Sequence, residues 1–217
     1  MIIEHLTVGA LACTCTIVGD EASGEAIVVD GGDDVDRIAA LLERRGLRAK
    51  YLVHTHAHID HIGALAALRE RCGGCALLHP GDLPLYRTLA IQAQWLGLDQ
   101  SPPIVTLDED LHDGDELRIG AVTLRALHTP GHTPGSTSFA LEANGTTSTL
   151  LTGDTLFAGA IGRWDLGGTS AADIIASIRE KLLVYDNGTT VIPGHGRATT
   201  IGIERTTNPF LIAPSGS

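Results

Sequence analysis

The segment Thr55-His56-Ala57-His58-Ile59-Asp60-His61 holds the densest group of metal-binding side chains in this chain of 217 residues. In an extended loop, side chains two positions apart point the same way, so His56 and His58 are able to bind one ion together. Asp60 and His61 stand at the turn into a helix and point in another direction. The segment therefore predicts two neighbouring metal ions, and a spacing of about 3.5–4 Å between two metals is typical of hydrolytic sites.

One loop supplies too few ligands for two ions, so the rest of the chain must provide more. His132, Asp154 and His195 are candidates because each lies in a glycine-containing turn, within 129–135 (TPGHTPG), 152–154 (TGD) and 193–196 (PGHG) respectively. Glycine and proline fix tight turns and so place a side chain at the end of a strand. Imidazole together with carboxylate suits zinc, iron or manganese, whereas calcium prefers oxygen ligands.

Two further histidines lie close to these candidates, but we assign neither to a metal. His54 ends a predicted strand and faces away from Thr55, and His128 lies four positions before His132. Histidines beside metal ligands commonly orient those ligands. We therefore expect His54 and His128 to support the site or to belong to the core.

Short apolar runs alternate with amphipathic stretches along the chain. Strands are predicted at 1–8, 11–18, 26–30, 50–54, 75–79, 136–141, 148–153 and 190–192, and one or two strands at 116–128, with a hairpin turn at Asn144-Gly145. A helix is predicted from an N-cap at Asp33 or Asp34 to Gly46, and others at 61–71, 82–96, 171–183 and 199–206. No repeat or linker interrupts this order. We predict one α/β domain over 1–212 and a frayed tail over 213–217.

The net charge of the chain indicates which kinds of binding partner are unfavourable. Fifteen basic and 26 acidic residues give a formal net charge of −11, which disfavours binding to nucleic acid and to anionic membranes. No apolar run reaches the ~18–20 residues that a membrane span requires, and residues 1–5 show no secretory signal. We expect a cytoplasmic protein that acts on a small molecule, and its oligomeric state stays open.

The four cysteines form two close pairs, Cys13 with Cys15 and Cys72 with Cys75. In a chain without a secretory signal we expect all four to be reduced and mostly buried. The alternative is a disulfide between Cys72 and Cys75, which have the two-residue gap of a redox pair.

The order of the motifs resembles that of the metallo-β-lactamase superfamily over nearly the whole chain. THxHxDH at 55–61 is followed by PGHT at 130–133, GD at 153–154 and PGHG at 193–196. Asp30, in Val29-Asp30-Gly31-Gly32, matches the first motif of the family, whose aspartate braces the histidine loop. The resemblance implies a four-layer αββα sandwich with its site at the rim between two sheets.

The resemblance also implies a ligand set for two divalent metal ions, with zinc favoured and iron or manganese as alternatives. The first ion would be held by His56, His58 and His132, the second by Asp60, His61 and His195, and both by a bridging Asp154. Asp60 and Asp154 are then the catalytic carboxylates. Water bound to such ions reaches a pKa near ~7, so no protein nucleophile is required.

Two stretches narrow the position within the superfamily. Residues 156–165 (LFAGAIGRWD) and 199–211 are similar to the short bacterial glyoxalase II-like hydrolases, which cleave the thioester S-D-lactoylglutathione to D-lactate and glutathione. Arg163 stands where longer members place a lysine near glutathione, and Arg197 where they place a tyrosine that touches substrate. We predict both arginines as substrate contacts, and an Arg163–Asp165 ion pair is an equal alternative.

Other functions share parts of this pattern. A persulfide dioxygenase has the same loop but a single iron, and a hydrolase of another thioester or ester would need the same centre. A flavodiiron-type electron carrier usually has glutamate at the position of His58, so His58 argues against that class. A purely structural metal site is disfavoured, because closed structural zinc sites prefer cysteine-rich shells.

Overall fold

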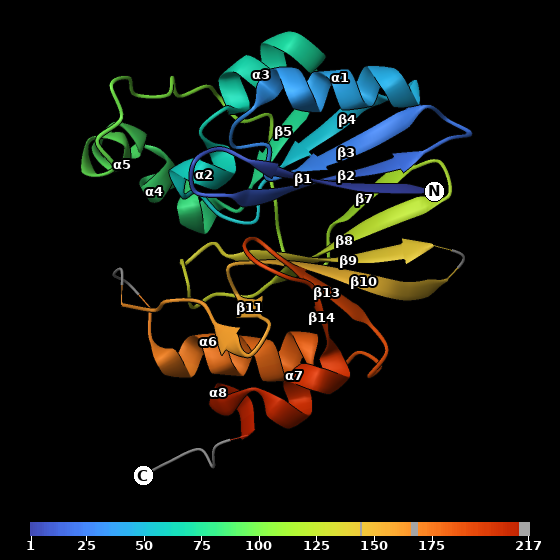
Figure 1. Ribbon diagram of the computed structural model, residues 1–217, viewed down its shortest axis with the longest axis vertical. Coiled ribbons are helices and arrows are strands. Elements are labelled where there is room, and N and C mark those ends of the chain that lie inside the picture. Colours follow the sequence, from blue (N-terminus) through green and yellow to red (C-terminus); the bar gives the residue numbers. More distant parts are fainter. Residues whose placement is uncertain (144, 166–168, 213–217) are drawn as a thin grey trace.

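Two six-stranded sheets pack face to face, with helices on the outer face of each, in the computed structural model, which describes residues 1–143, 145–165 and 169–212 (Figure 1). This is the four-layer αββα sandwich that the motif order implies, and the prediction of the fold class is confirmed. The first sheet has the order β1-β2-β3-β4-β5-β6 and the second β14-β13-β10-β9-β8-β7.

The first sheet is antiparallel at one end and parallel at the other. Its strands are β1 (Ile2–Val8), β2 (Cys13–Asp20), β3 (Glu25–Val29), β4 (Arg48–Val53), β5 (Cys75–Leu78) and β6 (Glu109–Asp110). The parallel pairing of β3 with β4 requires a crossover, which α1 (Val35–Arg45) provides. Its buried residues are Ile38, Ala39, Leu41 and Leu42, and Gly46 ends it in a left-handed conformation.

The second sheet begins as an antiparallel meander. Its strands are β7 (Glu116–Ile119), β8 (Val122–His128), β9 (Thr137–Ala143), β10 (Thr146–Gly153), β13 (Thr190–Pro193) and β14 (Thr199–Thr200). β13 pairs with β10 in parallel, and α6 (Ala171–Ser177) lies in the crossover between them. A small ribbon of β11 (Leu156–Phe157) and β12 (Ala160–Ile161) follows β10, and α7 (Ile201–Thr207) and α8 (Pro209–Ile212) close the chain beside α6.

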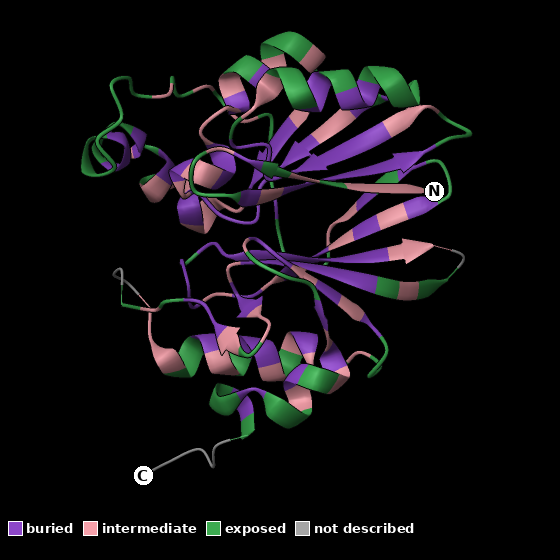
Figure 2. Ribbon diagram, in the orientation of Figure 1, coloured by how far each residue is buried: buried purple, intermediate pink, exposed green. Residues whose placement is uncertain are grey.

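The main core lies between the sheets, where strands from both contribute buried side chains (Figure 2). Phe139 of β9 is fully buried there and packs in one cluster with Val53 of the first sheet and Leu151 of the second. Two outer cores lie under the helices on the far side of each sheet. Apolar side chains cover both faces of each sheet. Polar side chains of a site are therefore expected where the strands end.

Several predicted helices are shorter or broken in the structure. The helix predicted over 61–71 begins two residues earlier and divides into α2 (Ile59–Ile62) and α3 (Leu65–Cys72). The helix predicted over 82–96 divides into a 3₁₀ turn (Pro80–Asp82), α4 (Leu83–Tyr86) and α5 (Leu89–Trp95). Thr88 donates its hydroxyl to the carbonyl oxygen of Leu85, a local bond that competes with a continuous helix.

The remaining differences lie near the C-terminus. The helix predicted over 171–183 ends in a π-helical turn (Ile178–Leu182), and the one predicted over 199–206 begins with the short strand β14. Asn144 of the predicted hairpin turn and the predicted frayed tail at 213–217 lie outside the described residues. Among the helices of the described ranges, none has the length and apolar character needed to cross a membrane.

Candidate metal centre

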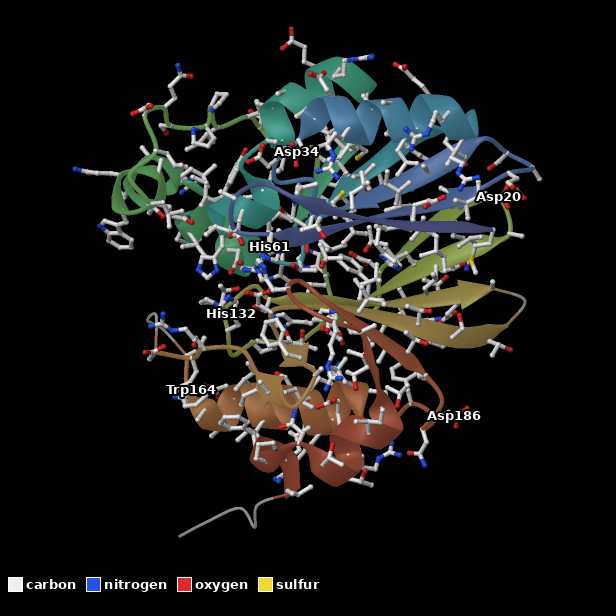
Figure 3. The ribbon with its side chains drawn as sticks, in the orientation of Figure 1. Asp20, Asp34, His61, His132, Trp164 and Asp186 are labelled. Carbon is white, nitrogen blue, oxygen red and sulfur yellow. The ribbon has the colours of Figure 1, made fainter. Side chains whose placement is uncertain are left out.

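The seven predicted ligands come together at one edge of the sandwich, between the two halves of the fold. His56 and His58 lie between β4 and α2, and Asp60 and His61 lie in α2. From the second half come His132 after β8, Asp154 after β10 and His195 after β13. Figure 3 shows His61 and His132 on the same edge, one from each half. The sequence therefore identified a set of side chains that the fold brings together.

The first cluster consists of three imidazole rings. His58 Nδ1 lies 2.9 Å from His56 Nε2 and 3.0 Å from His132 Nε2. The outward nitrogens of the other two rings have partners: His56 Nδ1 lies 3.0 Å from Thr55 Oγ1, and His132 Nδ1 lies 2.9 Å from the carbonyl oxygen of Arg163. A carbonyl oxygen only accepts, so His132 carries its proton on Nδ1 and directs a lone pair inward.

The same reasoning applies to His56. The Thr55 hydroxyl donates its proton to Asp30 Oδ2, 2.8 Å away, so it is free only to accept from His56 Nδ1. His56 Nε2 is then also an inward lone pair. Nitrogen lone pairs about 3 Å apart repel one another unless a cation lies among them. Zinc–nitrogen bonds of about 2.0–2.1 Å place tetrahedral ligand atoms about 3.3 Å apart, so this cluster fits such an ion.

The second cluster lies next to the first and adds a carboxylate. His61 Nε2 lies 3.3 Å from His195 Nε2, and Asp60 Oδ2 lies 3.1 Å from His195 Nε2 and 3.6 Å from His61 Nε2. His61 Nδ1 lies 3.0 Å from Asp30 Oδ2, which fixes its proton on the outward side. His195 Nδ1 lies 3.3 Å from the carbonyl oxygen of Ala12. This cluster also directs nitrogen and oxygen atoms to a common point, where His195 Nε2 shares a proton with Asp60 Oδ2.

Asp154 lies between the two clusters. Its Oδ2 is 3.7 Å from His132 Nε2, and its Oδ1 is 3.5 Å from His61 Nε2 and 3.8 Å from His195 Nε2. Within the described residues, Oδ1 is buried and has no hydrogen-bond partner. A buried carboxylate oxygen without a donor is costly unless a cation neutralises it. The arrangement fits a carboxylate shared by two ions.

Burial and neighbouring charges act differently on the ligand rings of the centre. Although burial of His61 acts in the opposite direction, the nearby charges, among them Asp30 and Asp154, raise its pKa well above the usual value. Burial, with His132 and His61 nearby, lowers the pKa of His58 to about 3, and burial lowers the pKa of His56 well below its usual value. Both rings are therefore neutral at pH 7. Although burial acts in the opposite direction, the hydrogen bond from His195 and the charges of His61 and His195 lower the pKa of Asp60 to about 2. That bond also raises the pKa of His195, and a bound cation would displace this proton.

Three buried side chains hold the loops of the centre in place. Asp30 has a left-handed φ of 55° and accepts hydrogen bonds from the Thr55 amide and hydroxyl as well as His61, which is the bracing role predicted for it. Asp82 accepts from the Ala57 amide at 2.9 Å, the Thr133 hydroxyl at 2.8 Å and the Gly135 amide at 2.6 Å. Gln92 accepts from the amide of Ile59, in the first turn of α2.

Asp82 and Gln92 were not predicted, and the signal for them is weak. Asp82 follows Pro80-Gly81, a turn of the kind that carries His132 and His195, but it belongs to no metal-binding pattern. Cys13 was likewise unforeseen beside the centre. Its buried Sγ lies 3.6 Å from His61 Nδ1.

The two predicted substrate arginines are exposed beside the centre, and the charge of Arg163 is close enough to contribute to the lowered pKa of His58. Arg163 pairs with Asp165 through two bonds of 3.0 and 3.1 Å and is exposed, which corresponds to the alternative structural role. Its backbone oxygen, however, holds His132. Arg197 is exposed two residues after His195. A contact of either side chain with substrate stays a prediction.

His54 and His128, which were assigned to no metal, each bond to a carbonyl oxygen near the centre. His54 is buried and bonds to the carbonyl oxygen of His61 through Nδ1, 2.9 Å away, so it supports α2. His128 Nε2 donates to the carbonyl oxygen of Pro134 in the turn that carries His132.

All four cysteines are free, so the alternative disulfide is absent from the structure. Cys13 and Cys15 are buried as expected, whereas Cys72 and Cys75 are only partly buried.

Comparison with known proteins identifies the family of the chain. The family model for the metallo-beta-lactamase superfamily matches residues 8–195, a range that includes all seven clustered side chains. The chain belongs to the metallo-beta-lactamase superfamily.

Individual superfamily members cover nearly the whole chain. It is 35% identical to the hydroxyacylglutathione hydrolase GloC of Haemophilus influenzae over 99% of this chain and 100% of that protein. It is 32% identical to the mitochondrial persulfide dioxygenase ETHE1 of Bos taurus over 92% of this chain and 72% of that protein. The crystal structure of TTHA1623 in a di-iron-bound form superposes with a TM-score of 0.82, at 35% identity, covering 96% of this chain and 100% of the other.

Proposed function

We propose that this superfamily member is a metal-dependent thioester hydrolase that binds two divalent cations. The observation that carries the proposal is the position of Asp154, whose two carboxylate oxygens face two separate clusters of lone pairs. His56, His58 and His132 would hold one cation, and Asp60, His61 and His195 the other. The similarity to a protein solved in a di-iron-bound form supports two ions. Zinc is our first candidate, and the ligand set also suits iron or manganese.

Bound divalent cations would supply Lewis acidity and lower the pKa of water to about 7. The protein contributes the rest of the chemistry by positioning. Asp60 and Asp154 are carboxylates beside the reacting region and orient water toward the thioester carbonyl carbon, and Asp30 and Asp82 hold the loops that bear the ligands. Addition of water and cleavage of the carbon–sulfur bond yield a carboxylic acid and a thiol. A thiolate is a good leaving group because its thiol has a pKa near ~8.5.

The similarity to GloC supports a hydroxyacyl thioester, and S-D-lactoylglutathione is the first compound to test. We further propose action in the cytoplasm on a small molecule, without a nucleic acid or membrane partner, in keeping with the net charge of −11. The direct test follows thiol release from lactoylglutathione by protein saturated with zinc. Turnover that disappears on chelation and returns with metal supports the proposal. No turnover of any thioester at two metals per chain would overturn it.

A second candidate function is persulfide dioxygenation, because of the similarity to bovine ETHE1. Because the dioxygenase class shares the loop at 55–61, the number of bound ions distinguishes the two functions. The similarity to GloC and to a protein solved in a di-iron-bound form favours hydrolysis. An oxygen electrode distinguishes the two functions. Oxygen uptake with glutathione persulfide, together with one iron per chain, would establish the dioxygenase instead.

A further inference from the structure

A pocket of about 380 Å³ lies beside the second ligand cluster and shares Asp60 with it. It is bounded by the turn between β1 and β2, by α2, and by the segment 96–103 that follows α5 (Figure 1). The lining is mainly apolar and includes Leu11, Ile59, Leu96, Leu98, Pro102 and Pro103. A concave apolar pocket of this size is typical of a site for a small molecule.

Three of these side chains are exposed to an unusual degree for leucine. Leu11, Leu96 and Leu98 have exposed fractions of 46%, 45% and 48%, although they face one common hollow. Apolar surface gathered in a concave region gains free energy when a ligand covers it. Their placement therefore favours an apolar ligand group.

The pocket meets the metal centre at Asp60. Asp60 lines the pocket, and its Oδ2 lies 3.1 Å from His195 Nε2. The turn that places Leu11 in the wall also places Ala12, whose carbonyl oxygen lies 3.3 Å from His195 Nδ1. A group bound in the pocket is therefore adjacent to the point where the second cluster converges.

The charges of the wall decide which part of a thioester fits. Asp33 and Asp60 are the ionisable residues in the lining, and lysine, arginine and histidine are absent from the described residues that form it. Two carboxylates in a largely apolar wall repel an anionic group, and desolvation adds to the cost. The carboxylate-bearing carrier of a thioester such as lactoylglutathione is therefore disfavoured here, whereas an uncharged chain is accommodated.

We infer that this pocket binds the acyl chain of the substrate, and that the preferred acyl group is an uncharged aliphatic chain longer than lactoyl. The inference rests on the proposed thioesterase function and names its acyl specificity. The thiol carrier then extends to the opposite side of the centre, where His132 and the backbone of Arg163 lie.

A series of thioesters that share one thiol and differ in acyl chain tests the inference. From acetyl through butyryl to hexanoyl, kcat/KM should rise by up to about fourfold for each methylene group buried. Hexanoate should also inhibit more strongly than lactate as a product. Hydrolysis that is independent of chain length, or fastest for lactoyl, would overturn the inference while leaving the thioesterase function intact. No hydrolysis of any member by fully metal-loaded protein would instead overturn the proposed function.

A matched pair of variants ties the effect to this pocket. Leu98→Glu adds a charge to the wall at a side chain that is already half exposed, so the fold should tolerate it. We expect it to reduce the ratio of hexanoyl to acetyl kcat/KM at least tenfold and to raise the inhibition constant of hexanoate. Ile203→Glu makes the same change at a 52% exposed position on α7, outside the pocket, and should leave both quantities unchanged. An equal effect of both variants, or no effect of Leu98→Glu, would contradict the assignment.

Discussion

At the scale of single residues, the centre depends on hydrogen-bond partners on the outward side of four of its five imidazole rings. Asp30 fixes His61, and the carbonyl oxygens of Arg163 and Ala12 fix His132 and His195. Each partner determines which nitrogen carries the proton, and therefore which nitrogen is left to bind a cation. The ligands alone would not form the centre without these bonds.

The backbone at Gly194 approaches the ligand side chains closely. A Cβ atom at this position would lie 2.4 Å from Asp154 Oδ1 and 2.7 Å from His61 Cε1. We therefore expect Gly194→Ala to displace these groups and to reduce the metal content and the hydrolytic rate at least tenfold. Elemental analysis and a thioester assay provide the measurements.

Gly188→Ala is the matched control, because no heavy atom lies within 4 Å of the position that its Cβ would occupy. This variant should bind metal and turn over substrate as the unmodified chain does. Full metal content in Gly194→Ala would show that the centre is looser than its geometry indicates.

At the scale of elements, the two sheets place ligands from both halves of the chain at one edge, so the core between them supports the centre. Phe139 is fully buried in that core. Phe139→Ala should lower the free energy of unfolding by about 3–5 kcal/mol, because it removes buried apolar area and leaves a cavity. Val184→Ala, at a side chain that is 69% exposed, should change it by no more than about 0.5 kcal/mol. Urea denaturation followed by circular dichroism measures both, and similar effects of the two variants would contradict this account of the core.

A second contact between the sheets is sensitive to pH. His79, after β5, stacks on His128 of β8 with ring centroids 4.0 Å apart and an interplanar angle of 9°. Burial, followed by the nearby His128 and His112, lowers the pKa of His79 to about 4, although Asp110 and Asp113 act in the opposite direction. The folded state therefore favours the neutral ring, while the unfolded chain has a pKa near ~6.5. The stability from this group is complete above pH ~6.5 and is lost as the pH falls toward about 4.

The variant His79→Asn isolates that contribution, since asparagine offers an acceptor for the Gly81 amide but does not titrate. We expect the free energy of unfolding of metal-free protein to fall less between pH 7 and pH 4.5 in the variant than in the unmodified chain. Urea titrations at several pH values give the two slopes. Identical slopes would show that His79 does not titrate between the folded and unfolded states.

At the scale of the whole molecule, the sequence was sufficient to predict the fold class and the seven clustered side chains. His132, Asp154 and His195 were found because each lies in a glycine-containing turn that fixes its place at a strand end. Asp82 was missed because it acts through a contact with residues 133–135, some 50 positions away, which no local pattern records. The break near Thr88 was missed because one hydroxyl bond overrides helical periodicity there.

The substrate contacts were the hardest to predict for a related reason. The resemblance predicted Arg163 as a substrate contact with an Arg163–Asp165 ion pair as an equal alternative, and the structure contains that ion pair. The pocket beside Asp60 combines a turn near residue 10 with a segment near residue 100, so it exists only after the chain has folded. The residues that would determine substrate specificity come together only in the folded chain, whereas the metal ligands are recognised in separate sequence motifs.

The central claim is that seven side chains from both halves of the fold converge on two cations that share Asp154. Elemental analysis of purified protein, after saturation with zinc and removal of the excess, tests it most directly when the Asp154→Ala variant is measured beside the unmodified chain. We predict two equivalents of metal in the unmodified chain and the loss of most of that metal, with the activity, in the variant. A single equivalent in the saturated unmodified chain, or two equivalents in Asp154→Ala, would contradict the claim.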